Sequence, residues 1–207
     1  SLEAGRVLEE VLGDRMHAGI VVDVHEGKLA RIQAYAGDHP FPSERNVDIT
    51  KQIIKLLSGL DEKDLVIFVV SGGGSTLLCQ PKNMTCRDES EIVEALFRAG
   101  ANIEKINTIR KHLSLARGGF LAQYAFPAQA VSLIFSDVPG NRLEFVASGP
   151  TVRDTTTVED AKKLIALREK SRKTGDFKTA DRIRDQLRSD YGIILEDTPK
   201  GAKWKRA

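Results

Sequence analysis

Leu65-Val66-Ile67-Phe68-Val69-Val70 is followed immediately by Ser71-Gly72-Gly73-Gly74-Ser75, and this junction decides the fold. The apolar, β-branched run predicts a strand buried on both faces, as in a parallel sheet. The three glycines let the backbone turn sharply and leave N–H groups open to an anion, with two serine hydroxyls at the rim. Two interpretations follow: a phosphate or carboxylate cradle at the carboxyl end of a central strand, or a tight turn without a ligand.

Predicted strands and helices alternate on both sides of this junction. Apolar spacing predicts helices at 2–12, 47–57, 88–98 and 103–115, and strands at 19–24, 29–35 and 130–135. Capping patterns predict two further helices, at about 156–173 and 177–188, and the stretch 193–205 predicts a small β-hairpin with its turn at 197–201. The sequence therefore predicts an α/β fold with a three-layer, mostly parallel sheet (Rossmann-like) and a small C-terminal helix-helix-hairpin appendage.

Candidate functional side chains occur where other predicted elements end. Asp137 directly follows the second apolar strand, where α/β enzymes place metal-binding or general-base carboxylates, although an Asp there also caps a turn. Arg110 and Lys111 could neutralise a phosphate, with Asn107 supplying a neutral hydrogen bond, or they form a solvated basic turn of helix.

Two loops supply further candidates, of which the first could line the same crevice. The first, 147–151, is rich in small residues and contains Ser148 and Gly149. The second, 36–44, is rich in Gly and Pro and contains Asp38 and His39. These two side chains could touch a ligand, but a loop histidine more often satisfies nearby backbone groups, and the sequence by itself favours that interpretation.

Composition limits the classes of protein to consider. The chain has 207 residues, 41% hydrophobic and 29% charged, which suits one domain with a real core plus an appendage. No apolar run approaches the length that spans a bilayer, and two cysteines are too few for a disulfide framework, so we expect a cytoplasmic protein without membrane partners. Because the chain starts at Ser1 within a predicted helix, we also expect a fragment.

The net charge differs along the chain. Residues 1–160 hold 17 Lys and Arg against 22 Asp and Glu, a net −5, whereas residues 161–207 hold 14 against 7, a net +7. The split indicates two pieces with different partners, and nucleic acid is a candidate partner for the basic one. Sequence leaves open whether the chain forms a homo-oligomer.

Residues 1 to about 160 resemble the N-terminal domain of class II glycerate kinases, the family whose second domain is called MOFRL. The matching strings are Leu12-Gly13-Asp14-Arg15, Gly37-Asp38-His39-Pro40-x-Pro42, Ser71-Gly72-Gly73-Gly74-Ser75, Ile106-Asn107-Thr108-x-Arg110-Lys111-His112-Leu113-Ser114, Gly118-Gly119, Ser136-Asp137-Val138 and Ala147-Ser148-Gly149-Pro150-Thr151. The resemblance implies phosphorylation of D-glycerate to 2-phosphoglycerate with ATP and Mg²⁺.

The resemblance also implies roles for individual residues. It implies catalytic roles for Asp137, Arg110 and Lys111. It implies cofactor binding by Ser71, Gly72, Gly73, Gly74, Ser75, Asn107, Ser148 and Gly149, while the metal ligands stay unknown. The family's Gly-Lys-Ala-Ala string, with its catalytic lysine, would fall just before Ser1, and the MOFRL domain is missing from the sequence. We therefore expect impaired or absent catalysis by this chain, because phosphoryl transfer needs charge stabilisation from several sides.

Residues 161 to about 206 resemble the C-terminal end of bacterial cysteinyl-tRNA synthetase. The matching strings are Arg168-Glu169-Lys170-x-Arg172, Asp176-Phe177-x-x-Ala180-Asp181-x-Ile183-Arg184-Asp185-x-Leu187 and Gly192-Ile193-x-Leu195-Glu196-Asp197-Thr198-Pro199-x-Gly201-x-x-Trp204. This resemblance implies tRNA(Cys) anticodon binding by Arg172, Phe177, Asp181 and Asp197. The alternatives to a kinase domain are thus a tRNA-binding segment or an inactive fusion, divided at 160/161.

Overall fold

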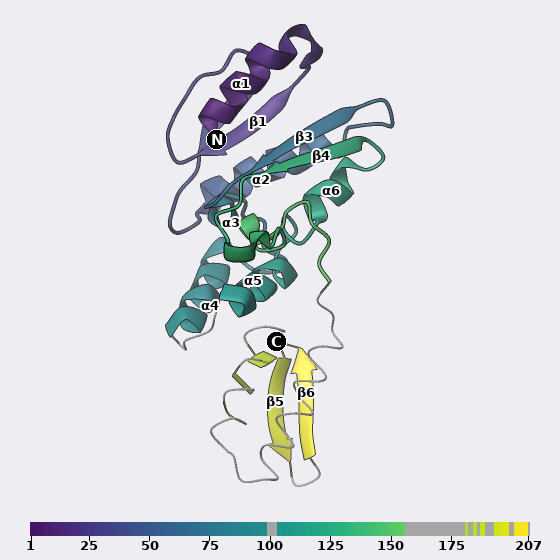
Figure 1. Cartoon of the computed structure of the whole chain (residues 1–207). Coiled ribbons are helices and arrows are strands. Elements are labelled where there is room, and N and C mark those ends of the chain that lie inside the picture. The colour runs from purple at the N-terminus through teal and green to yellow at the C-terminus, as the bar shows by residue number, and fades with distance from the viewer. Residues whose placement is uncertain are drawn as a thin grey trace. The chain divides into compact units, whose positions relative to one another are not determined.

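The computed structural model describes residues 1–98, 103–155, 181, 184, 185, 187, 188, 193–198 and 201–206. The chain divides into two compact units, which we describe separately (Figure 1). The first unit comprises Ser1–Glu91 and Leu113–Asp154, and the second comprises Ile92–His112 and Thr155–Ala207. No described helix is both long enough and apolar enough to cross a membrane.

Two pairs of parallel strands form the framework of the first unit. Strand β1 (Gly19–Asp23) pairs with β2 (Ile32–Ala36), and β3 (Leu65–Val70) pairs with β4 (Gln129–Ile134) (Figure 1). The predicted α/β class with mostly parallel strands is confirmed. Strand β2 begins later than predicted, and its parallel pairing makes the segment between β1 and β2 a crossover.

Helices α1 (Leu2–Leu12) and α2 (Glu44–Leu57) follow the predicted apolar periodicity. The start of α2 was predicted too late, at residue 47. The helix begins at Glu44 because the hydroxyl of Ser43 accepts a hydrogen bond from the Arg45 N–H at 3.1 Å, which caps the first turn.

The β3–β4 pair is covered by helices on one face. Leu57 of α2 and Leu121 of helix α6 (Phe120–Ala125) form a buried cluster, against which Val66 and Phe68 of β3 pack. The remaining short helices of this unit are α3 (Gly74–Leu77), η1 (Gly13–Arg15), η2 (Pro139–Asn141) and η3 (Val146–Ser148). This packing partly buries Val66 and Phe68, whereas Val70 is buried against Val146 and Ala147.

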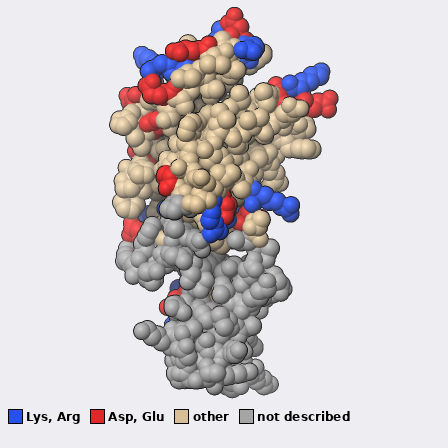
Figure 2. Space-filling model, in the orientation of Figure 1, with Lys and Arg blue, Asp and Glu red and all other residues tan. Residues whose placement is uncertain are grey.

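The prediction that β3 is buried on both faces is wrong, because Leu65 is exposed, residues 66–69 are only partly buried and Val70 alone is buried. Leu65 is 59% exposed, and Val131 and Leu133 on the facing strand are 46% and 45% exposed. Figure 2, in the orientation of Figure 1, shows an uncharged area over the first unit where β3 and β4 lie.

The second unit contains helix α5 (Ile103–His112) and an antiparallel hairpin of β5 (Ile193–Thr198) and β6 (Gly201–Arg206). Helix α4 (Cys86–Arg98) begins in the first unit and continues into this one. The predicted hairpin is present, and Thr198 faces Gly201, so its strands are longer than predicted. The helices predicted at 156–173 and 177–188 lie largely outside the described residues.

Candidate functional site

The glycine loop (residues 71–75) turns the chain at the carboxyl end of β3, and each glycine is required for a different reason. A Cβ on Gly72 would lie 2.2 Å from Oδ2 of Asp137, so only glycine leaves room for that carboxylate. Gly73 has a φ of +79°, in the left-handed region that favours glycine. A Cβ on Gly74 would lie 2.7 Å from the Cβ of Ala147. The loop is therefore shaped by its contacts as well as by its turn.

The backbone N–H groups at the tip of the glycine loop differ in whether a protein acceptor receives them. The N–H of Gly74 donates to the Ser71 carbonyl at 3.4 Å, which closes the turn. Within the described part of the chain, no protein acceptor receives the N–H of Gly72 or Gly73. Both of these glycines are exposed. Their donors have the capacity that an anion cradle needs.

Two ionisable side chains from distant parts of the sequence flank the same two glycines. Asp137, exposed, lies against Gly72, as predicted for an acid at the end of the neighbouring strand. His39, also exposed, has its Nε2 atom 3.8 Å from the position of a Cβ on Gly73. Asp137 lies within a short turn in which the Val138 N–H donates to the Ser136 hydroxyl at 3.2 Å. The structure thus brings an acid and an imidazole together at the glycine loop.

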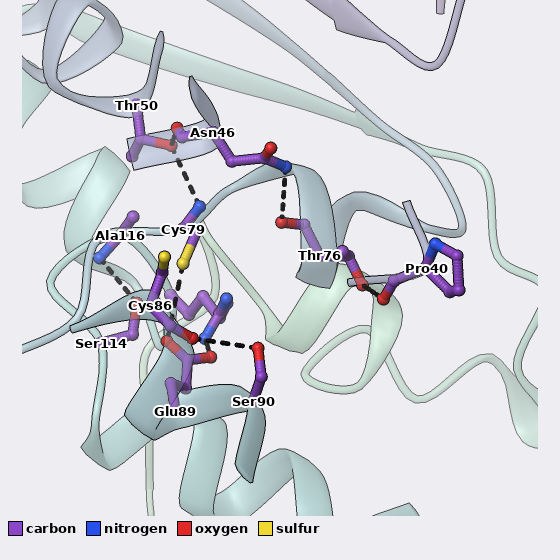
Figure 3. A network of polar contacts seen from close by, with 11 residues as sticks. Pro40, Asn46, Thr50, Thr76, Cys79, Cys86, Glu89, Ser90, Ser114 and Ala116 are labelled. Atoms are coloured by element: carbon purple, nitrogen blue, oxygen red, sulfur yellow. Dashed lines mark hydrogen bonds and ion pairs between the residues drawn. The ribbon is translucent and has the colours of Figure 1, made fainter. Parts of the chain in front are cut away.

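Asn46 holds the His39 loop in place, and the sequence analysis missed it. Its side chain is fully buried: Nδ2 donates to the carbonyl oxygens of Asp38 (3.0 Å) and Thr76 (3.1 Å), and Oδ1 accepts from the Asp38 N–H (2.9 Å). Thr76 follows the glycine loop, and its hydroxyl donates to the Pro40 carbonyl at 3.5 Å (Figure 3). The spacing Ser43-x-x-Asn46, a capping-box pattern, was the available signal.

The stretch that contains Ser148 and Gly149 serves mainly to join loops. Ser148 is fully buried, and its carbonyl accepts the Gly118 N–H at 3.0 Å, while the Gly149 carbonyl accepts the Gly119 N–H at 2.8 Å. Ala147 is the member of this stretch that contacts the glycine loop. Ligand binding by Ser148 and Gly149 stays a prediction.

A buried polar network consists of Asn46, Thr50, Cys79, Glu89 and Arg117, and Figure 3 labels the first four. The Thr50 hydroxyl donates to the Asn46 carbonyl at 2.8 Å and accepts from the Cys79 N–H at 3.0 Å. Arg117 forms an ion pair with Glu89, and neither side chain is more than 3% exposed. A buried charge of this kind is tolerated because its partner is buried with it.

Two thiols belong to the same region. Burial, with the negative charge of Glu89 adding to it, raises the pKa of Cys79 to about 12. Burial and a hydrogen bond to the Glu44 carboxylate raise the pKa of Cys86 to about 11. Both cysteines are free and buried, so they behave as inert packing groups.

Three predicted site residues, Asn107, Arg110 and Lys111, lie on α5 in the second unit. Asn107 and Lys111 are each only 4% exposed, and Arg110 is partly buried. The alternative of a solvated basic turn therefore does not hold for Lys111. Their roles toward a ligand stay predictions.

Among the residues predicted to bind RNA, Arg172 and Phe177 lie outside the described residues. Asp181 is exposed and forms an ion pair with Arg184 at 3.0 Å. Asp197, predicted in a turn, lies instead within β5 opposite Ala202. RNA binding by these residues stays a prediction.

Comparisons with known proteins match most of the chain. The chain is 38% identical over 195 residues to a D-glycerate 2-kinase of Thermotoga maritima, which covers 92% of this chain and 43% of the relative. It is 45% identical over 152 residues to an Agrobacterium vitis protein provisionally named hydroxypyruvate reductase, covering 72% and 35%. The crystal structure of a Thermotoga maritima glycerate kinase superposes with a TM-score of 0.72 at 33% identity, covering 89% and 50%.

The chain thus spans half or less of the length of these relatives. The predicted resemblance to glycerate kinases is confirmed at the level of homology, whereas the resemblance of residues 161–206 to cysteinyl-tRNA synthetase stays a prediction. The model of a family described as a domain of unknown function, DUF4147, matches residues 2–178. The chain belongs to the DUF4147 family.

Proposed function

We propose that this chain carries part of the site of an ATP-dependent kinase that phosphorylates D-glycerate to 2-phosphoglycerate. The observation that carries the proposal is the position of Asp137 against Gly72, just beyond the carboxyl ends of β4 and β3, beside backbone N–H groups that no described protein group accepts. Relatives named glycerate 2-kinase and glycerate kinase support the choice of substrate and of ATP as donor.

The proposed reaction needs a proton acceptor and a place for negative charge. A glycerate hydroxyl oxygen forms a bond to the γ-phosphorus of ATP, the bond from that phosphorus to the bridging oxygen breaks, and ADP leaves. The hydroxyl proton passes to a carboxylate, the role we assign to Asp137. The amides of Gly72 and Gly73 would hold an anionic group of one substrate.

Mg²⁺ would accompany ATP and neutralise charge on its phosphates. In the described residues, no group of three or more His, Cys, Asp and Glu could hold a metal ion. A site without such a cluster is compatible with Mg²⁺, because this ion keeps several water ligands and takes only one or two protein carboxylates beside substrate phosphates. Arg110, Lys111 and Asn107 stay proposed contributors from α5.

The test of this proposal is equilibrium binding by calorimetry, with ATP·Mg²⁺ and D-glycerate titrated separately into the chain. We expect Gly73→Val to abolish binding at the glycine loop, because a branched side chain there blocks approach to the amides. Gly140→Val is the matched control, since Gly140 has the same φ of +79° with nothing within 4 Å of a Cβ. If Gly73→Val and Gly140→Val bind ATP·Mg²⁺ and D-glycerate with equal affinities, the glycine loop is only a turn and does not bind a ligand.

Two further expectations concern the chain as a whole. A coupled assay for 2-phosphoglycerate tests the expected impairment of catalysis, and ordinary kinase turnover by this chain would contradict it. Binding of NADH instead of ATP would favour the reductase name of the Agrobacterium vitis relative. A cytoplasmic location stays a prediction from sequence, and whether the chain forms a homo-oligomer stays open.

A second candidate function, implied by the resemblance of the C-terminal segment to cysteinyl-tRNA synthetase, is binding of tRNA(Cys). The net +7 of residues 161–207 suits a nucleic acid partner. A gel shift with tRNA(Cys) at several salt concentrations tests it. Binding that ignores changes in the anticodon would reduce the interaction to charge alone.

A further inference from the structure

Gly72 and Gly73, the two central glycines of the loop, have different neighbours. This difference indicates which substrate the loop can bind. The Asp137 carboxylate lies on the Gly72 side, where a Cβ would be 2.2 Å from its Oδ2 atom. The His39 imidazole lies on the Gly73 side, with Nε2 3.8 Å from the position of a Cβ. A small ligand on these two peptide units therefore meets an acceptor at one end and a ring nitrogen at the other.

A nucleotide phosphate is a poor ligand for the peptide units of Gly72 and Gly73. Its oxygens carry multiple negative charges, and at Gly72 they would lie against the carboxylate of Asp137, which like charge disfavours. A hydroxyl group has the opposite preference, because it donates a hydrogen bond to a carboxylate. The Gly72 side of the loop thus favours a hydroxyl over a phosphate.

The Gly73 side favours a carboxylate. The Gly73 N–H, which no described protein group accepts, and the His39 ring nitrogen supply two donors for one anionic group. The His39 loop is held before any ligand arrives, since buried Asn46 bonds both the N–H and the carbonyl of Asp38. A donor on a fixed loop contributes to affinity without a large cost of ordering.

We propose that the acceptor, a short 2-hydroxy carboxylate, occupies the glycine loop, and that ATP binds elsewhere. The substrate carboxylate lies at Gly73 and His39, and its reacting hydroxyl lies at Asp137. His39 is then a substrate-binding residue. This assignment rests on the proposed kinase function and narrows it: the glycine loop belongs to the sugar acid instead of the nucleotide.

The experiment compares His39→Gln with the unaltered chain, using D-glycerate and ATP·Mg²⁺ in separate calorimetric titrations. We expect D-glycerate to bind roughly tenfold more weakly to the variant, the size typical for loss of a hydrogen bond to a charged group, with ATP·Mg²⁺ affinity unchanged. The matched control is His17→Gln, an exposed histidine away from the loop, which should change neither affinity.

A second measurement needs no variant. D-Glycerate is titrated with and without saturating ATP·Mg²⁺, and we expect binding in both cases because the two ligands use different places. Mutual exclusion, or loss of ATP·Mg²⁺ affinity in His39→Gln with D-glycerate unchanged, would assign the loop to the nucleotide and overturn the inference. D-Glycerate binding that is equal in His39→Gln and the unaltered chain overturns the inference and leaves the kinase proposal standing. An unaltered chain that binds neither ligand removes both.

Discussion

The buried polar network and the glycine loop lie next to each other, but they differ in whether their polar groups have hydrogen-bond partners within the protein. In the network, the Asn46, Thr50 and Glu89 side chains are at most 2% exposed and hydrogen-bonded to protein partners. At the loop, Gly72 and Gly73 expose donors that no described protein group accepts. The network therefore contributes to the stability of the fold, whereas the glycine loop keeps backbone donors available for a ligand.

The largest expected loss of stability comes from breaking the buried ion pair. Arg117→Ala leaves the Glu89 carboxylate buried without its cation, and we expect the free energy of unfolding to fall by about 3–5 kcal/mol in denaturant titration. Arg87→Ala, which breaks the exposed pair with Glu91, should cost about 0–1 kcal/mol.

A double variant separates charge from packing at the same pair. Replacing both partners, Arg117→Met with Glu89→Leu, should restore much of the lost stability, because no buried charge remains. Equal losses from Arg117→Ala and Arg87→Ala would mean that burial of the ion pair has no energetic consequence.

Asn46→Ala has the next largest expected effect, and it connects the two regions. It removes hydrogen bonds to Asp38 and Thr76, and unsatisfied buried groups of this kind lower the free energy of unfolding by about 2–3 kcal/mol. D-Glycerate binding should weaken as well, because the His39 loop loses its anchor. Gln123→Ala, an exposed amide, is the control, and unchanged binding in Asn46→Ala would disconnect the network from the site.

The thiols supply a pH-dependent test of burial. Because the fold raises the pKa of Cys79 to about 12 and of Cys86 to about 11, it favours the protonated thiols. Their contribution to stability is present below their ordinary pKa of 9.0 and is lost as the pH rises toward those values. At pH 9 the native chain should react with iodoacetamide far more slowly than the chain in denaturant. Equal rates would show that the thiols are open to solvent.

The smallest expected loss of stability is at the site itself. Asp137 is exposed, so Asp137→Asn should change the free energy of unfolding by no more than about 0.5 kcal/mol. Asp48→Asn, at an exposed ion pair with Lys51, is the matched control. A loss from Asp137→Asn as large as that from Asn46→Ala would assign the carboxylate to the framework.

Local patterns in the sequence predicted the elements well and their environment less well. The apolar runs located β3 and β4 within a residue, because strand formation follows local periodicity. Exposure of the outer face of β4 could not be predicted, since it depends on which elements pack there. Asn46 was missed because a buried asparagine and an exposed one look alike in sequence.

The candidate site also contains one residue whose position could be predicted from sequence and one whose position could not. Asp137 could be placed near the glycine loop, because the carboxyl ends of parallel strands meet at one edge of the sheet. His39 belongs to a loop that is far in sequence from β3 and β4, and its position beside Gly73 depends on the hydrogen bonds of Asn46. Sequence alone predicted the acid but favoured a backbone role for the histidine.

The hydrogen bonds of the Asn46 side chain to Asp38 and Thr76 have a consequence for how quickly a substrate can be captured. A recognition surface assembled during folding has no closing step to wait for, so encounter with the ligand, not rearrangement of the loop, should limit the association rate. Selectivity then has to come from the fixed spacing between the imidazole and the acid, because a rigid surface discriminates by shape and charge at first contact.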